Sequence, residues 1–357
     1  VENGSIFQTT SDTETIIQLI AVSKRTNFVD KLIDALFQIQ GGFSLVVMTN
    51  KKLIGVRDPY GIRPLILGDL DGAPIFTSET CSLDIIGAKF VREVENGEIV
   101  VISDDGIKSI KPFPKVNCRP DIFEYIYFSR PDSFLGGKNI YQCRKNFGKQ
   151  LAKESKTEAD LVTAVPDSGL PATIGYAAES NIPFELGLIR NHYVGRTFIE
   201  PKQQVRQFGV KLKHNANSGC IKNKRIILID DSIVRGTTCF KIIKMLNDAG
   251  AKEIHMKVAS PPITHPDYYG VDTPKQSELL AAKKKDLKEM AKYIGVKTLS
   301  FLSIDGLYKS MGYKNRNNNS PQFTDHCFTG DYPVIPLDKV SHKLKHSQLS
   351  LLSNISL

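Results

Sequence analysis

The sequence predicts an α/β protein of two parts, an antiparallel β-rich part followed by a parallel sheet flanked by helices. The first observation is length, because 357 residues correspond to about two domains of ordinary size. The second is a change of rhythm, from short apolar runs separated by turns to an alternation of strand, loop and helix. The stretch Lys111-Pro112-Phe113-Pro114 separates the two patterns. We therefore expect domains at 1–112 and 113–335, followed by a C-terminal tail at 336–357.

In the first part, one helix precedes a set of short strands. Ser11 and Glu14 have the spacing of a capping box, and apolar residues follow them with helical periodicity. Strands are predicted at 43–48, 53–56, 64–67, 75–77 and 98–102, between turn-forming residues. Because short turns join these strands, we expect them to pair antiparallel.

The second part alternates strands with helices. Strands are predicted at 161–165, 225–229 and 253–259, and helices at 172–178 and 240–249. This alternation is typical of a parallel sheet that is covered by helices. The Asn-rich segment 315–320 predicts a mobile loop.

The composition excludes several classes of protein. Apolar residues make up 41% of the chain and charged residues 24%, which suits a folded core rather than disorder. Apolar runs stay well below the roughly 18 residues of a membrane span, and no secretory signal is visible. Lys and Arg outnumber Asp and Glu by 47 to 38, but no aromatics interleave the basic clusters, which favours phosphate-rich small substrates over nucleic acid. The six scattered cysteines favour reduced thiols and a cytoplasmic protein.

The strongest chemical signal lies at 225–238. An apolar strand leads to Asp230 and Asp231, and Arg-Gly-Thr-Thr follows at 235–238, where a helix should begin. Backbone N–H groups and hydroxyls at a helix start suit a phosphate, whereas the carboxylates suit ribose hydroxyls or Mg²⁺. An ordinary strand-to-helix turn would explain one Asp and one Thr, but not the paired acids together with Arg-Gly-Thr-Thr. A sugar phosphate satisfies both halves of the motif.

This segment resembles the phosphoribosyl pyrophosphate (PRPP) motif of type I phosphoribosyltransferases. Further segments narrow the resemblance to the amidophosphoribosyltransferase family: RDPYGIRPL at 57–65, SET at 78–80, FEYIYFSRPDS at 123–133 and RNHYVGRTFI at 190–199. The resemblance implies a type I phosphoribosyltransferase domain preceded by part of an N-terminal-nucleophile (α+β) glutaminase domain. It also implies a pentosyltransferase that opens purine synthesis. Ammonia from glutamine would attack C1 of PRPP, and pyrophosphate would leave to give 5-phosphoribosylamine.

The resemblance also implies roles for individual residues. The PRPP-binding residues would be Asp167, Ser168, Gly169, Asp230, Asp231, Ser232, Val234, Arg235, Gly236, Thr237 and Thr238. One Mg²⁺ per PRPP site would be held by Ser168, Asp230 and Asp231, and Arg190 and Arg196 of a flexible loop would neutralise the departing pyrophosphate. From the residues alone, 166–169 is also a generic turn and 190–199 a solvated basic connection. His192, His214 and Ser218 depart from the family pattern, so we expect altered loop behaviour or affinity rather than lost chemistry.

The glutaminase part lacks counterparts of the residues that start the family's reaction. The family's nucleophile is an N-terminal Cys whose own α-amino group is the base, whereas this sequence starts with Val1. We therefore expect a truncated glutaminase part. Asp12 matches the family's ligand for the glutamine α-amino group, and it is also explained as a carboxylate that stabilises a helix N-terminus.

Some relatives hold an iron–sulfur cluster on four cysteines, and Asp121, Asp267, Thr324 and Cys327 stand at those positions here. One thiol of four does not assemble a cluster, so we expect none and interpret Cys327 as a buried thiol. The resemblance further implies a homo-oligomer and purine nucleotide inhibitors. Two alternatives stay open, namely a non-catalytic PRPP- or nucleotide-binding regulator of the same fold and an unstable fragment with exposed strand edges.

We predict that the polypeptide of residues 1–357 makes phosphoribosylamine from PRPP and ammonium at elevated pH, where free NH₃ is more abundant, but not from glutamine. None of the six cysteines has a free α-amino group beside it, and losing such a nucleophile costs many orders of magnitude in rate. The measurement is pyrophosphate release with each nitrogen donor. Glutamine-driven release of pyrophosphate without contaminating glutaminase would contradict the prediction. If PRPP binds tightly but neither donor gives pyrophosphate release, the regulator is favoured.

Overall fold

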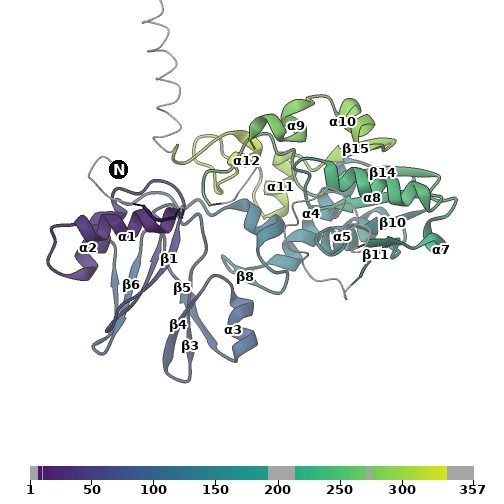
Figure 1. Cartoon of the computed structure of the whole chain (residues 1–357). Coiled ribbons are helices and arrows are strands. Elements are labelled where there is room, and N and C mark those ends of the chain that lie inside the picture. The colour runs from purple at the N-terminus through teal and green to yellow at the C-terminus, as the bar shows by residue number, and fades with distance from the viewer. Residues whose placement is uncertain (1–6, 10, 192–213, 271–274, 336–357) are drawn as a thin grey trace, which may run out of the picture.

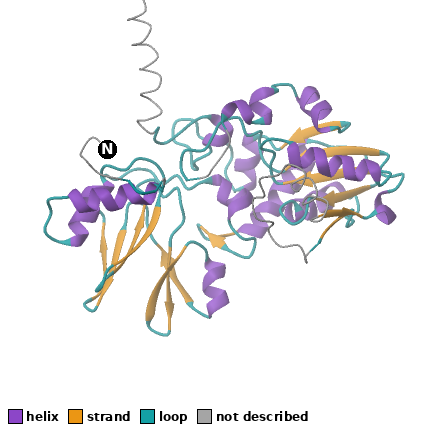
Figure 2. Cartoon of the chain, in the orientation of Figure 1, coloured by secondary structure: helices purple, strands orange, loops and turns teal. Residues whose placement is uncertain are grey.

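The computed structural model describes residues 7–9, 11–191, 214–270 and 275–335, and the statements below concern these residues. Figure 1 shows a β-rich N-terminal part in purple and blue beside an α/β C-terminal part in teal, green and yellow. Figure 2 shows the same contrast by secondary structure, with helices on both faces of the sheet only in the C-terminal part. The two kinds of architecture predicted from the sequence are therefore present.

The N-terminal part contains two antiparallel sheets, which confirms the predicted pairing. Their orders are β1-β2-β6-β7 and β4-β3-β5. The strands are β1 Ser44–Met48, β2 Leu53–Arg57, β3 Ile66–Leu70, β4 Ala73–Thr77, β5 Lys89–Glu93, β6 Ile99–Ser103 and β7 Gly106–Ile110. The helices are α1 Asp12–Val22, α2 Phe28–Leu36 and α3 Thr80–Ile86, so the expectation of a single helix is wrong.

Helix α1 begins where the capping box predicts, but its cap differs from the expected one. The Ser11 side chain makes no hydrogen bond to the helix. The Glu14 carboxylate accepts instead from the backbone N–H groups of Gln8 and Thr9, each at 2.8 Å. Glu14 therefore ties the preceding segment to the helix rather than closing a reciprocal box with Ser11.

The C-terminal part is built on a parallel sheet of order β10-β13-β14-β15. Its strands are β10 Leu161–Ala164, β13 Arg225–Asp230, β14 Glu253–Val258 and β15 Thr298–Phe301. The three predicted strands are confirmed, and β15 adds an edge strand. The predicted helices are confirmed as α5 Leu170–Ser180 and α8 Thr237–Asp248.

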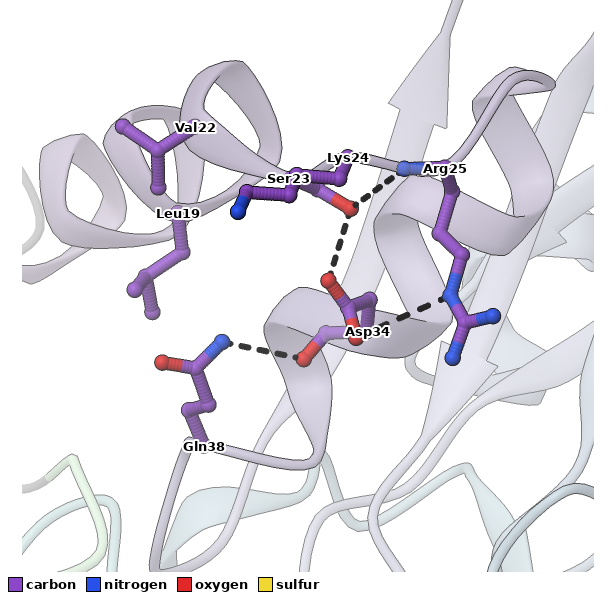
Figure 3. Close-up of a pocket in the computed structure, with 7 residues that line it drawn as sticks. All are labelled: Leu19, Val22, Ser23, Lys24, Arg25, Asp34 and Gln38. Carbon is purple, nitrogen blue, oxygen red and sulfur yellow. Dashed lines mark hydrogen bonds and ion pairs between the residues drawn. The ribbon is translucent and has the colours of Figure 1, made fainter.

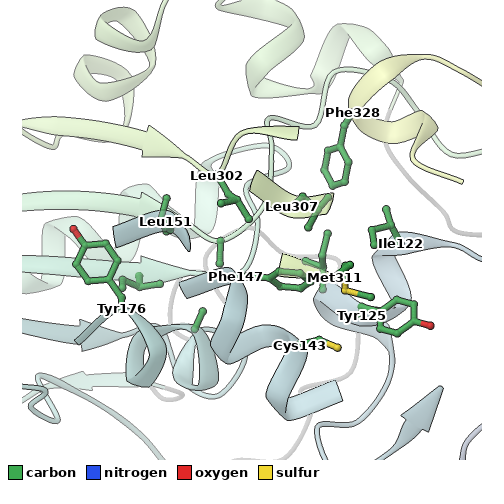
Figure 4. Packing of buried hydrophobic residues seen from close by; sticks show 14 of the residues in the cluster. Ile122, Tyr125, Cys143, Phe147, Leu151, Tyr176, Leu302, Leu307, Met311 and Phe328 are labelled. Atoms are coloured by element: carbon green, nitrogen blue, oxygen red, sulfur yellow. The ribbon is translucent and has the colours of Figure 1, made fainter. Parts of the chain in front are cut away.

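Strand β13 is apolar along most of its length because helices cover both faces of the sheet. Ile227 and Ile229 belong to the buried cluster with α5 and with α4 Ile140–Glu154, part of which Figure 4 shows. Ile226 and Leu228 belong to the cluster on the other face, with α8 and α10 Leu287–Ile294. This two-sided burial fixes the position of the strand that ends in the predicted acidic pair.

Shorter elements connect these layers. They are the π-helix η1 Glu124–Phe128, β8 Phe134–Leu135, β9 Lys138–Asn139, β11 Leu188–Arg190, β12 His214–Ala216, α7 Ser218–Ile221, the 3₁₀ turn η2 Gln276–Glu278, α9 Leu280–Lys283, α11 Ile304–Ser310 and α12 His326–Thr329. Segment 315–320 lies outside helices and strands, as expected, although Arg316 anchors it by donating to Asp325 and Asp331, each at 2.6 Å. Its mobility stays a prediction, and the tail 336–357 lies outside the described residues. Among the described helices, none has the length and apolar character that crossing a bilayer requires.

Lys257 on β14 is a buried lysine in the middle of the parallel sheet. Its side chain is 2% exposed, and its ammonium donates to Ser300 Oγ at 3.1 Å. Burial lowers the pKa of Lys257 from 10.5 to about 8. The folded protein therefore loses this proton at a lower pH than the unfolded chain, so stability should rise as pH increases from about 8 to 10.5.

We predict that Lys257→Met removes about 2–3 kcal/mol of this pH-dependent rise in the free energy of unfolding. The measurement is urea unfolding of both proteins at pH 7.5 and pH 10, and the wild type should gain more stability than the variant. Lys244→Met, at an exposed lysine of α8, is the control and should retain the wild-type pH dependence. Identical pH dependence in wild type and Lys257→Met would contradict the prediction.

Candidate functional site

The candidate site lies where β10 and β13 end. The carboxyl ends of neighbouring parallel strands meet at one edge of a sheet, and the Val165 N–H donates to Ile229 O at 2.8 Å. A Cβ on Gly169 would lie 2.4 Å from that same Ile229 oxygen, so only glycine allows this approach. The 166–169 turn therefore lies directly beside the 230–238 loop.

A cavity of about 540 Å³ opens between these loops, within the range of small-molecule sites. Nine of the predicted PRPP-binding residues line it: Ser168, Asp230, Asp231, Ser232, Val234, Arg235, Gly236, Thr237 and Thr238. Asp167 and Gly169 belong to the adjacent turn and do not line it. The structure therefore brings together two motifs that lie about 60 residues apart in the sequence.

Asp230 and Asp231 form a buried carboxylate pair, each 7% exposed. Asp230 Oδ1 accepts from the Asp231 N–H at 2.9 Å and from Ser168 Oγ at 3.3 Å, and Ser232 Oγ donates to Asp231 Oδ2 at 2.6 Å. Burial, and then the neighbouring Asp231 charge, raises the pKa of Asp230 well above its usual range. A cation or hydroxyl donors entering the cavity would therefore be stabilised by a pair of poorly compensated carboxylates.

The donors here fit a magnesium ion that binds together with a substrate. The two carboxylates and the Ser168 hydroxyl are oxygen ligands, which Mg²⁺ prefers, so the residues present fit this ion. Within the described ranges, no group of three His, Cys, Asp or Glu side chains lies close enough to hold an ion alone. Substrate oxygens and water would have to complete the coordination.

The loop after β13 ends in the geometry of an anion site. Gly236 caps α8 with a φ of +78°, a left-handed conformation that favours glycine. The first turn of the twelve-residue helix α8 then presents unpaired N–H groups and the hydroxyls of Thr237 and Thr238 beside the cavity. The Arg235 guanidinium lies 3.1 Å from Glu278, so its charge is already paired.

The predicted loop residues are only partly described. Arg190 ends β11 and forms an ion pair with Asp167, so it lies beside the 166–169 turn. His214, which pairs with Arg190 across β11 and β12, lines the cavity. Arg196 lies in the segment 192–213, outside the described residues. The described residues Arg190 and His214 therefore lie beside and within the lining of the cavity, respectively.

Asp12, the predicted glutamine ligand, lies in the first turn of α1 and does not line the cavity. Its carboxylate is exposed and accepts from the N–H of Thr13 at 2.8 Å. This geometry fits the stabilisation of a helix N-terminus, and binding of glutamine stays a prediction.

Sequence reasoning missed a second wall of the cavity. The lining residues not predicted are Asp121, Phe123, Tyr127, Phe128, Val165, Pro166, His214, Ile233, Cys239, Ile263, Asp267 and Cys327. The three aromatic residues belong to the FEYIYFSRPDS segment, where η1 forms a π-helix, a rare element that is frequent at functional sites. In the sequence this segment contributes only to the family resemblance, and its run of aromatic residues is the signal that could have indicated a wall of the cavity.

The four positions at which some relatives carry cluster cysteines come together on this wall. Asp121 and Thr324 form a parallel bridge, and Asp267 and Cys327 line the same cavity as Asp121. Asp267 lies 2.8 Å from His326 Nε2, and burial raises the pKa of Asp121 to about 7. Cys327 is buried, as predicted. Paired polar groups therefore occupy three of the four positions.

Figure 3 shows a second hollow, of about 370 Å³, between α1 and α2. Its polar groups already bond to one another: Ser23 Oγ donates to Asp34 Oδ2 at 2.7 Å, and Gln38 Nε2 donates to Asp34 O at 3.2 Å. Arg25 lies 3.9 Å from the Asp34 carboxylate. Apart from Lys24, the polar side chains that line this hollow are held by these contacts, so the cavity at β10 and β13 is the stronger candidate.

Comparisons with known proteins identify the family to which the chain is similar. Residues 1–84 match the glutamine amidotransferase domain family. The amidophosphoribosyltransferase of Rhizobium etli is 56% identical and is matched over 99% of this chain and 72% of the relative. The chain spans only 59% of the chloroplastic amidophosphoribosyltransferase 1 of Arabidopsis thaliana, at 52% identity. The solved glutamine PRPP amidotransferase of Bacillus subtilis, complexed with ADP and GMP, superposes with a TM-score of 0.86 at 47% identity, over 94% of this chain and 73% of that one.

Proposed function

Because the chain belongs to the amidophosphoribosyltransferase family, the pentosyltransferases of the first step of purine biosynthesis, we propose that its cavity binds PRPP for amino transfer. One observation carries this proposal. A buried carboxylate pair and a helix-start anion site line the same cavity, beside the turn after β10. The ribose hydroxyls, the 5-phosphate and the pyrophosphate of PRPP need such acceptors and donors in one cavity.

The proposed binding mode places each part of PRPP against one element. The 5-phosphate binds at 232–238, where the N–H groups and hydroxyls at the start of α8 donate to it. The ribose hydroxyls donate to Asp230 and Asp231, and the pyrophosphate lies against the backbone of the 167–169 turn. Orientation of C1 toward the incoming nitrogen is then the main contribution of the protein.

We propose one Mg²⁺ per PRPP, held by Ser168, Asp230 and Asp231 together with substrate oxygens and water. When bound, it supplies positive charge that offsets the acidic pair and the pyrophosphate. The high pKa of Asp230 supports this proposal, because the pair favours proton or metal uptake.

In the proposed reaction, the lone pair of ammonia forms a bond to C1 while the bond from C1 to the pyrophosphate oxygen breaks. Positive charge builds on the ribose ring, and the leaving pyrophosphate carries away the bonding electrons. Arg190 is proposed to neutralise that negative charge, and its ion pair with Asp167, beside the 166–169 turn, supports this role. Arg196 is proposed to act with it, and the proton of the new C1–ammonium group passes to water.

We also propose nucleotide inhibitors, a homo-oligomer and a glutamine site. The relative from Bacillus subtilis was solved with ADP and GMP, which supports inhibition of this chain by purine nucleotides. A homo-oligomer and a glutamine site that includes Asp12 follow from the family resemblance. All six cysteines are free, which supports a reducing compartment such as the cytoplasm. A non-catalytic PRPP-binding regulator is the competing function, since it would use the same cavity.

We predict that the double variant Asp230→Asn/Asp231→Asn weakens PRPP–Mg²⁺ binding by about 30- to 1,000-fold, because two charge-assisted contacts are lost. Asn resembles the protonated form that the high pKa of Asp230 already favours, so the fold should tolerate the change. The measurements are calorimetry with PRPP and ammonium-dependent release of pyrophosphate.

Asp248→Asn is the matched control, because this exposed aspartate lies at the far end of α8, where it pairs with Lys244. It should bind PRPP as the wild type does. Equal PRPP affinity in the double variant would refute the site. Tight binding by the wild type without any ammonium-dependent turnover would favour the regulator.

A further inference from the structure

Arg63 is a partly buried cation of the N-terminal part whose side chain bonds to residues of the C-terminal part. It follows β2 in the RDPYGIRPL segment, and its side chain is 16% exposed. Its Nη1 donates to Glu124 Oε1 at 3.0 Å and lies 3.4 Å from Asp121 Oδ2. Its Nε donates to Tyr269 O at 3.1 Å, and its guanidinium carbon lies 5.2 Å from the centre of the Phe128 ring.

These partners belong to the two segments that form the second wall of the cavity. Asp121 and Phe128 line the cavity directly, at either end of the segment 121–128. Tyr269 lies two residues after Asp267, another lining residue, and its N–H donates to Asp267 Oδ1 at 2.6 Å. Arg63 itself does not line the cavity. Arg63 therefore connects the two wall segments from outside the cavity.

Arginine suits this position for a physical reason. Asp121 is 1% exposed and Glu124 is 6% exposed, so both carboxylates need a cation or a proton. The planar guanidinium donates in several directions at once and presents its face to an aromatic ring. A lysine would keep the charge but could not donate to Glu124 and to the Tyr269 carbonyl while stacking on Phe128.

We propose that Arg63 is a positioning residue for PRPP binding, through which the N-terminal part fixes the aromatic wall of the cavity. This inference rests on the proposed function. It extends that function, because the ammonium-dependent reaction needs no glutaminase chemistry and yet depends on a side chain of the N-terminal part. Arg63 contacts both Phe128 and the Tyr269 carbonyl. If Arg63 is removed, the segments 121–128 and 267–269 lose this shared contact.

A second contact between the two parts provides a matched control. Glu79 accepts from the Arg130 N–H at 2.6 Å and from Ser133 Oγ at 2.9 Å. Neither Arg130 nor Ser133 lines the cavity. Glu79→Gln therefore loosens the attachment of the two parts without touching the wall.

The test compares Arg63→Met, Arg63→Lys and Glu79→Gln in the full chain, with saturating ammonium and varied PRPP. We expect Arg63→Met to raise KM for PRPP by about tenfold or more, with a smaller change in kcat, and Arg63→Lys to recover part of the loss. Glu79→Gln should lower the melting temperature but leave KM for PRPP within about twofold of the wild type.

An unchanged KM in Arg63→Met would overturn the proposal, and so would an equal rise in KM in Glu79→Gln, which would indicate general loosening. If Arg63→Met does not fold, Glu124→Gln removes the partner carboxylate instead and should raise KM in the same direction. Failure of the proposed function looks different, because the wild type itself would then neither bind PRPP by calorimetry nor turn it over.

Discussion

The site depends on one close approach, the contact of the turn after β10 with the end of β13. Ile229 O accepts the Val165 N–H and lies too near Gly169 to leave room for a side chain. Strand β13 cannot move away, because Ile226 to Ile229 are fully buried between helices on both faces. The Ala259 N–H likewise holds Asp230 O at 2.9 Å from the other side. Packing of an apolar strand therefore determines where two carboxylates stand.

The charge of the cavity contrasts with the charge of the chain. The chain has a net charge of +9, yet four aspartates line the cavity. Asp121 pairs with Arg63 and Asp267 with His326, whereas within the described residues no ion pair neutralises Asp230 and Asp231, and the lining Arg235 pairs with Glu278. An acidic cavity repels a polyphosphate unless cations enter with it. The proposed Mg²⁺ and the arginines of 190–199 would supply the positive charge that a polyphosphate needs beside these carboxylates. The net charge of the chain indicated an anionic substrate, but it did not indicate how the cavity holds that substrate.

The sequence predicted what local patterns determine. The apolar runs that lead to Asp230 and to the 166–169 turn located both strands, and parallel pairing then brought nine predicted residues to one cavity. Strands β5 and β7 were missed because most of their side chains are exposed and leave no apolar run. The wall at 121–128 was missed because its π-helix spans only five residues, too few to show a sequence period. The segment 121–128 lies near Asp267 because of contacts between residues far apart in the sequence, and local sequence patterns do not reveal such contacts.

The way in which the two parts join explains how one could influence the other. Each cluster of buried apolar residues in the described chain lies within a single part, so neither core extends across the boundary. Directed polar contacts connect them instead: Arg63 to Glu124, Glu79 to Ser133, and the Gly136 N–H to Glu93 at 2.6 Å. An apolar interface tolerates small sliding motions, whereas such contacts depend on angle and distance. A displacement of the N-terminal part would therefore reach the cavity through Arg63, whose partners Asp121 and Phe128 line it, and through the Ile62 carbonyl, which accepts the Asp121 N–H at 3.1 Å. It would not reach the cavity through Glu79, because its partners Arg130 and Ser133 do not line it.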